Sequence, residues 1–230
     1  MAVLKSNEKH IKPTVYMITG LFLCTATGYF LPSFAIPFKI ALPVLTLAIA
    51  SLWLCPWQIS LALAFSAAGD FMGSIDMLPG QIGFFALAHI CLIWYFAIRY
   101  HQKVEPDRKL TSKAKGHMTM IGFCALSILL ISFIRIAPHA PAGIIRTGIY
   151  VYSTIICLML IAAMLQRSSL YALGAVLFVF SDFILAWNLF VEPIHGAGYM
   201  IMIPYYIAQW LFFIRSTPYR IAPEMRILRF

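Results

Sequence analysis

Long apolar runs constrain this chain more than any other feature of its sequence. Eight such runs, each about twenty residues long, lie at 14–31, 36–54, 57–77, 81–100, 117–136, 144–165, 169–190 and 198–215. A helix needs about 20 mostly apolar residues to cross the hydrocarbon core of a bilayer. The runs are continuously apolar, whereas the strands of a membrane barrel alternate between polar and apolar residues, so they indicate helices. We expect an all-α polytopic membrane protein, built as a bundle of about eight transmembrane helices.

The composition agrees with a single membrane-embedded domain. Hydrophobic residues make up 62% of the chain and charged residues 11%, whereas a soluble domain has about 45–50% and about 25%. No small-residue cleavage site follows the first apolar run, so we interpret that run as a span and not as a signal peptide. The longest polar stretch is HQKVEPDRKLTSKAKG at 101–116. We predict one transmembrane domain over residues 1–230, with a basic cytoplasmic loop at about 101–116.

The basic residues are distributed unevenly between the two sides of the predicted bundle. Lysine and arginine accumulate in cytoplasmic loops. With the N-terminus in the cytoplasm, that side receives 14 of the 17 basic residues, and the opposite side receives Lys39, Arg135 and Arg146. We therefore expect both termini in the cytoplasm. The net charge of +9 then reflects topology and affinity for anionic headgroups, and it requires no nucleic-acid partner.

Three ionisable residues remain well inside the membrane, namely Asp70, His89 and Asp182. Such residues are rare in spans, and by default they are candidates for function. At 1.5 Å per residue, Asp70 lies about 10 Å below the outer end of its span, and His89 and Asp182 lie about 12 Å below theirs. Gly69 and Gly73 form a GxxxG pair beside Asp70, which lets a neighbouring helix approach closely. Because antiparallel helices place these polar groups at one level, we expect a single polar cavity that opens outward.

Further polar residues are predicted around this cavity. Lys39 and Arg146 begin their spans near the outer surface. Tyr205, Tyr206 and Gln209 are three or four residues apart, so they share one face of the last span. We expect this face to line the cavity, with the two cations at its rim.

A pair of carboxylates around a water molecule is a recurring hydrolytic arrangement, in which one acts as acid and the other as base or charge stabiliser. Asp70 and Asp182 fit that arrangement. The sequence contains no GxSxG nucleophile elbow and no HExxH zinc motif. Its five cysteines are widely spaced, so we interpret them as buried unpaired thiols. We expect neither a metal nor a cofactor.

Several stretches around these residues resemble the YhhN-like family of membrane lysoplasmalogenases. They are FK at 38–39, SAAGD ending at Asp70, FFALAH ending at His89, GAVLFVFSDFILAWNLF at 174–190 and YYIAQ at 205–209. The resemblance implies an eight-span hydrolase that cleaves the vinyl ether bond of lysoplasmalogens. The products would be a fatty aldehyde and glycerophosphoethanolamine or glycerophosphocholine. The partners it implies are a lysophospholipid substrate and membrane lipid, in the inner membrane of a bacterium.

The resemblance and the residue chemistry together give each candidate a role. Asp70 and Asp182 would be the catalytic acid and base, with Asp182 as the acid because Phe178, Phe180 and Phe183 surround it in sequence. The predicted substrate-binding residues are Lys39, His89, Arg146, Tyr205, Tyr206 and Gln209. Among them, the two cations would hold the phosphate. The site would lie in the outer half of the membrane.

Other functions are compatible with paired intramembrane aspartates. In a proton-coupled transporter, the carboxylates would load and release protons across the span. In an intramembrane aspartyl protease, a GD motif and a second aspartate on another span would activate water. A ligand-binding or structural membrane protein is a further alternative.

Overall fold

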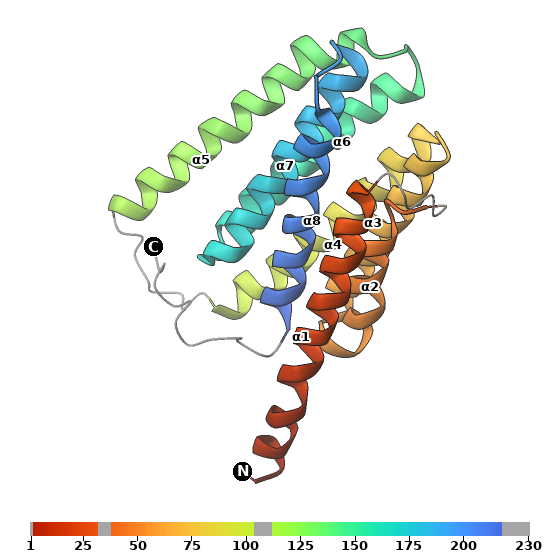
Figure 1. Cartoon of the computed structure of the whole chain (residues 1–230). Coiled ribbons are helices and arrows are strands. Elements are labelled where there is room, and N and C mark those ends of the chain that lie inside the picture. The colour runs from red at the N-terminus through yellow and green to blue at the C-terminus, as the bar shows by residue number, and fades with distance from the viewer. Residues whose placement is uncertain (1, 32–37, 104–111, 218–230) are drawn as a thin grey trace.

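The computed structural model describes residues 2–31, 38–103 and 112–217 (Figure 1). Within these ranges the chain forms eight α-helices and no strand, which confirms the predicted all-α fold. The helices are α1 (Ala2–Phe30), α2 (Leu42–Leu54), α3 (Trp57–Ser74), α4 (Leu78–Lys103), α5 (Ser112–Ile131), α6 (Ile144–Met164), α7 (Ser169–Phe190) and α8 (Ala197–Ser216). The centre of the predicted basic loop, 104–111, lies outside the described residues.

The helices differ in length and apolarity, the two properties that decide whether a helix can cross a membrane. Among the described residues, five stretches are long and apolar enough to do so: Leu78–His101, Thr119–His139, Ile144–Met164, Ser169–Phe190 and Ala197–Ser216. The apolar helix α2 has only 13 residues. The count of eight spans therefore stays a prediction.

Helix α2 begins later than the predicted span 36–54. Phe38 has a φ of +61°, which a continuous right-handed helix does not accommodate. Pro43 lies in the first turn of α2, where its missing N–H breaks no hydrogen bond. Lys39 consequently lies in a turn before the helix and not on the helix itself.

Successive helices run antiparallel, and the beginning of α1 and the end of α8 lie at the same, lower end of the molecule in Figure 1. The two helical hairpins α3–α4 and α7–α8 are the most closely packed pairs, and α8 also contacts α2 and α3. Helix α5 lies along one edge of the bundle (Figure 1). The bundle therefore encloses α8 while α5 faces outward.

Glycines permit the close approach of α3 and α4. A Cβ atom on Gly69 would lie 3.0 Å from the Phe85 ring, and one on Gly73 would lie 2.7 Å from the Gln81 amide nitrogen. The GxxxG pair beside Asp70 thus faces α4, and a larger residue there would push the two helices apart.

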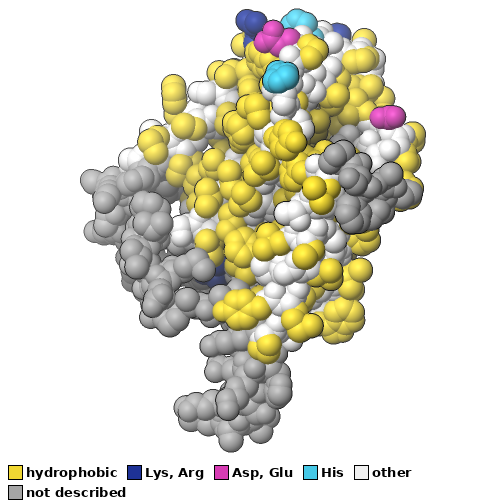
Figure 2. Space-filling view, in the orientation of Figure 1, with side chains coloured by type: hydrophobic (Ala, Val, Ile, Leu, Met, Phe, Trp, Pro, Cys, Tyr) yellow, Lys and Arg dark blue, Asp and Glu magenta, His cyan; other side chains and the backbone are white. Residues whose placement is uncertain are grey.

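The surface of the protein is apolar around its middle. Trp53, Phe123 and Ile144 expose 78%, 70% and 77% of their area. Figure 2 shows hydrophobic side chains covering the central part of the visible face, with charged and histidine side chains mostly at the upper end. Apolar surface of this extent is compatible with lipid and not with water. The chain is a membrane protein.

The lipid environment also explains why some of the cysteines are exposed. All five are free, as predicted, but only Cys91 and Cys157 are buried, while Cys24 and Cys124 are exposed. The expectation that every thiol is buried was wrong, because a thiol can face lipid as readily as it faces a protein core.

A π-helical turn, Ser132–Ile136, follows α5 and continues into a 3-10 turn, Ala137–His139. The wider turn adds a residue to the helical repeat. Ser132 and Ile136 are buried, and Ile134 between them is 65% exposed. This turn shapes one wall of the cavity described below.

Candidate active site

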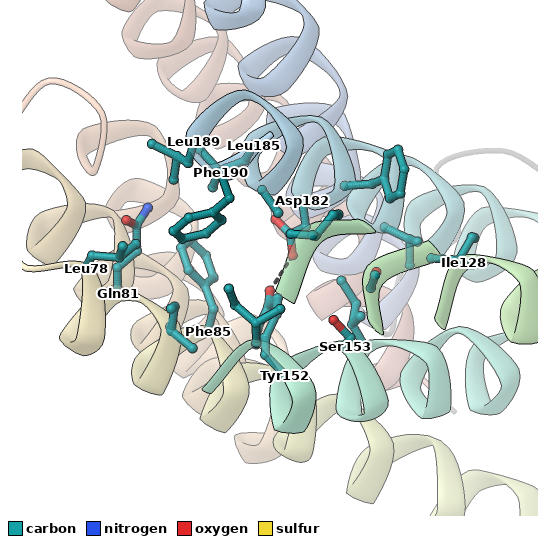
Figure 3. A pocket seen from close by; sticks show the side chains of 18 residues that line it. Leu78, Gln81, Phe85, Ile128, Tyr152, Ser153, Asp182, Leu185, Leu189 and Phe190 are labelled. Carbon is teal, nitrogen blue, oxygen red and sulfur yellow. Dashed lines mark hydrogen bonds between the residues drawn. The ribbon is translucent and has the colours of Figure 1, made fainter. Parts of the chain in front are cut away.

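Three helices bring Asp182, Tyr152 and His89 together. The Tyr152 hydroxyl on α6 donates a hydrogen bond to Oδ2 of Asp182 on α7, as Figure 3 shows. His89 on α4 is fully buried, and its Nε2 lies 3.0 Å from the Tyr152 hydroxyl and 3.7 Å from Oδ2 of Asp182. The carboxylate thus accepts a hydrogen bond from Tyr152, and His89 from a third helix lies beside both.

The donors in this group can be assigned from its geometry. A tyrosine hydroxyl has one hydrogen, and Tyr152 donates it to Asp182. The contact between His89 and Tyr152 therefore requires Nε2 of His89 to carry a hydrogen. Nδ1 of His89 is buried and has no hydrogen-bond partner among the described residues.

Asp70 has a tyrosine partner of its own. It is buried on α3, with 4% of its area exposed, and the Tyr205 hydroxyl on α8 donates to its Oδ2 at 2.8 Å. One turn further along α8, the buried Nε2 of Gln209 has no hydrogen-bond partner in the described part of the chain. Each of the two aspartates is therefore paired with a tyrosine from another helix.

Aromatic rings lie between the two carboxylate groups. The Phe178 ring lies 4.5 Å from the His89 ring and 5.3 Å from the Tyr205 ring, measured between centroids. The Phe85 ring lies 5.8 Å from that of Tyr205 and 6.1 Å from that of Phe178. The two carboxylates share one core, and these apolar rings separate their hydrogen-bonding partners.

A mainly apolar cavity adjoins Asp182. Its walls come from α4, α5 with the π-helical turn, α6 and α7, and its polar wall residues are Gln81, Ser132, Tyr152, Ser153 and Asp182. In Figure 3, Asp182 and Tyr152 point toward one another at its wall. Asp70 is not among the wall residues. Of the two carboxylates, Asp182 is therefore the one in contact with this cavity.

Lys39 and Tyr206 lie on the Asp70 side of the bundle. The Tyr206 hydroxyl donates to the carbonyl oxygen of Ile40 at 2.9 Å, which fastens the turn that carries Lys39. The ammonium group of Lys39 lies 5.5 Å from the centre of the Tyr29 ring, and this ring lies 6.0 Å from that of Tyr206. Neither Lys39 nor Tyr206 borders the cavity beside Asp182.

Arg146 binds backbone carbonyls near the start of α6. Its guanidinium donates to the carbonyl oxygen of Ala140 at 2.8 and 3.2 Å and to that of Pro138 at 3.2 Å. Arg146 therefore holds the segment between the π-helical turn and α6. It lies one turn before the cavity-lining Ile149.

Tyr152 was not among the residues predicted from the sequence. It lies eight residues into the span 144–165, which places its Cα about 12 Å below the outer end. That is the depth predicted for His89 and Asp182, so applying the depth argument to hydroxyl groups as well as charges would have found it. Within the described residues, no three His, Cys, Asp or Glu side chains gather as metal ligands would.

The fold and site define a helical membrane protein with a buried carboxylate, Asp70, and a partly buried one, Asp182, that borders an apolar cavity. Residues 34–216 match the model of the YhhN family. The chain belongs to the YhhN family, which confirms the resemblance seen in its motifs.

Two curated relatives are both described as lysoplasmalogenase TMEM86B. The human protein is 29% identical over 150 residues, which cover 60% of this chain and 62% of that protein. The pig protein is 30% identical over 152 residues, which cover 65% of this chain and 59% of that protein. The chain thus matches about three fifths of the length of each relative. No solved structure is significantly similar to it.

Proposed function

We propose that this protein is a membrane-embedded lysoplasmalogenase. It would hydrolyse the vinyl ether bond of lysoplasmalogens to a fatty aldehyde and glycerophosphoethanolamine or glycerophosphocholine. The observation that carries the proposal is a partly buried carboxylate, Asp182, at the wall of an apolar cavity, which accepts a hydrogen bond from Tyr152 and lies 3.7 Å from His89. The function named for the two relatives supports it. The end of the helical bundle that carries Asp182 would lie in the outer half of a bacterial inner membrane.

The cavity suits the alkenyl chain of such a substrate. Its walls are mostly Leu, Ile, Val and Phe side chains, and burying a methylene group there contributes about 0.8 kcal/mol. Arg146 lies on α6, one turn before the cavity-lining Ile149, and it would bind the phosphate. The vinyl ether would then lie beside Asp182.

The first chemical step would be proton transfer from Asp182 to carbon. The proton leaves Oδ1, because Oδ2 accepts the hydrogen bond from Tyr152. It bonds to the second carbon of the alkenyl chain, and the π electrons of the double bond form the new C–H bond. The first carbon becomes part of an oxocarbenium ion, stabilised by the ether oxygen and by the carboxylate that remains.

Water would complete the reaction. It adds to the first carbon of the oxocarbenium ion while the ionised Asp182 takes one of its protons, so that one residue acts first as acid and then as base. In the resulting hemiacetal, the C–O bond to glycerol breaks while the hydroxyl proton is transferred to the leaving oxygen, which releases the aldehyde and glycerophosphoethanolamine or glycerophosphocholine. Tyr152 and His89 would keep the Asp182 carboxylate in place through both proton transfers.

Asp70 would act through its charge and not by contact. It lies behind the Phe85 and Phe178 rings, outside the cavity wall. In the low dielectric of a membrane protein interior, an ionised carboxylate at this position would favour a developing cation. The two aspartates thus have different roles. Asp182 would act by direct contact with the substrate, whereas Asp70 would act through its electrostatic field.

The test measures aldehyde release from a lysoplasmalogen by the detergent-purified protein. Asp182→Asn should lower the rate by about 10²- to 10⁴-fold, and Asp70→Asn should lower it less. Asp76→Asn is the matched control, because Asp76 is an exposed turn residue with a positive φ that asparagine tolerates. A saturated alkyl ether analogue should not react, since it has no double bond to protonate.

Reaction in D2O tests the site of protonation. If Asp182 protonates carbon, the aldehyde carries one deuterium on the carbon next to its carbonyl group. Full activity in Asp182→Asn, or an aldehyde without that deuterium, would contradict the mechanism. If the wild-type protein releases no aldehyde, the function itself is wrong, and proton flux in liposomes would then test the transporter alternative.

A further inference from the structure

A second polar cluster lies at the opposite end of the same helices. Tyr171 on α7 is fully buried, and the guanidinium carbons of Arg99 and Arg215 lie 5.5 and 5.3 Å from the centre of its ring. Tyr171 is eleven residues from Asp182, which corresponds to about 16 Å along α7. The cluster is therefore separate from the candidate active site.

Hydrogen bonds hold the cluster rigidly. The Tyr171 hydroxyl lies 2.8 Å from that of Tyr95 and 3.2 Å from that of Ser216. Nη1 of Arg99 donates to the Tyr95 hydroxyl at 3.1 Å, and Nε of Arg215 donates to a serine hydroxyl on the turn before α7 at 2.9 Å. Helices α4, α7 and α8 thus meet at two half-buried guanidinium groups whose positions are fixed.

These two positive charges have no carboxylate partner in the described part of the chain. Among those residues, the contact within 4 Å between a basic and an acidic side chain is that of His89 with Asp182, at the other end of the bundle. Nε of Arg99 is buried without a hydrogen-bond partner among the described residues. Even a half-buried charge loses part of its hydration, which an anion can replace, so two guanidinium groups that contact the same tyrosine ring favour the binding of an anion.

We propose that Arg99 and Arg215 form a binding site for the phosphate group of an anionic phospholipid. Guanidinium groups bind phosphate oxygens through pairs of parallel N–H bonds. Basic pockets between transmembrane helices are a recurrent form of headgroup site. The position fits a lipid, because exposed apolar side chains lie near it on the same helices, namely Trp94 on α4 and Leu173 on α7, each 49% exposed. A bound headgroup would fasten α4, α7 and α8 together.

The experiment measures lipid-dependent stability of the full chain. Thermal unfolding is followed in detergent micelles with added phosphatidylglycerol or, for comparison, phosphatidylcholine. Phosphatidylglycerol should raise the unfolding temperature of the wild-type protein more than phosphatidylcholine does. Arg99→Gln and Arg215→Gln should each weaken phosphatidylglycerol binding by about tenfold in a titration, and the double variant should lose the difference between the two lipids.

The controls separate this site from general charge effects. Arg167→Asn removes an exposed arginine with a positive φ from the same end of the bundle, and it should keep the response to phosphatidylglycerol. Free glycerol phosphate should not replace the lipid. Arg99→Lys and Arg215→Lys keep the charge but lose the planar guanidinium, so they should bind with intermediate affinity even if the glutamine variants fold poorly.

Two results would overturn the proposal. One is an equal response to phosphatidylglycerol in the wild-type protein and the Arg99→Gln/Arg215→Gln variant. The other is full stabilisation by free glycerol phosphate, which would assign the site to a soluble anion. The readout does not depend on aldehyde release, so it stands apart from the proposed hydrolase activity.

Discussion

Asp70 and Asp182 each accept a hydrogen bond from a tyrosine on another helix, yet only Asp182 borders the cavity. Two carboxylates with similar partners therefore have different access to a substrate. The difference arises from the Phe85 and Phe178 rings, which lie on the Asp70 side of His89. Substitutions at Asp70 and at Asp182 should therefore separate the effects of substrate contact from the effects of electrostatic interaction.

Tyr152→Phe removes the hydroxyl that binds Asp182 and contacts His89. A hydrogen bond to a charged group contributes about 1.5–3 kcal/mol, so aldehyde release should fall by about 10- to 100-fold. Tyr150→Phe on the same helix is the control, because the described contacts of Tyr150 involve its ring and backbone only. Equal rates in the two variants would show that Tyr152 does not position the acid.

Gly69→Ala should disturb the packing of α3 on α4. The added Cβ would lie 3.0 Å from the ring of Phe85, a cavity-wall residue, and overpacking of this kind costs about 1–3 kcal/mol. Thermal unfolding should begin at a lower temperature, and activity should fall. Gly83→Ala on α4 meets nothing within 4 Å, and it should be neutral or stabilise the helix by about 0.5–1 kcal/mol.

Ala186→Leu should change the preference for chain length. Ala186 lines the cavity, and the larger side chain would displace two or three methylene groups of a long substrate. At about 0.8 kcal/mol for each methylene group, kcat/KM should fall by about tenfold or more for long chains and little for short ones. Val176→Leu, at a 43% exposed position on the same helix, should leave the preference unchanged.

Arg146→Lys separates two roles of that residue. Lysine keeps the charge but lacks the planar guanidinium group that donates hydrogen bonds to the carbonyls of Pro138 and Ala140. We expect the free energy of unfolding to fall by about 1–2 kcal/mol, whereas Arg135→Lys at an exposed position should have little effect. An unchanged unfolding temperature together with a severalfold higher KM would instead indicate that Arg146 acts mainly on the phosphate.

The helices and the level of the polar groups were predictable from the sequence. Continuous apolarity is sufficient to predict the helices, and the 1.5 Å rise per residue places His89 and Asp182 at equal depth from their shared end. The structure places the two side chains 3.7 Å apart. Depth along a helix is a local property, so it can be counted from the residues alone.

The partners of those groups were not predictable in the same way. The bond from Tyr205 to Asp70 spans 135 residues of sequence, and it depends on how α8 is rotated against α3. The sequence also contained no sign that the guanidinium of Arg146, a predicted phosphate ligand, donates to carbonyls of its own loop as well. Rotation of helices and folding of loops are set by packing across the whole bundle, which periodicity does not encode.

The π-helical turn Ser132–Ile136 holds one residue more than an α-helical turn does. Deletion of a single residue within this turn would therefore convert it to α-helix and leave the residues after it facing as they do now. Insertion of a residue into the regular helix of α5 would instead turn the following chain by about 100°. Ile136 and Ala137, now buried against α6 and α7, would then face lipid, so loss of one residue in the turn should be tolerated better than gain of one residue in α5.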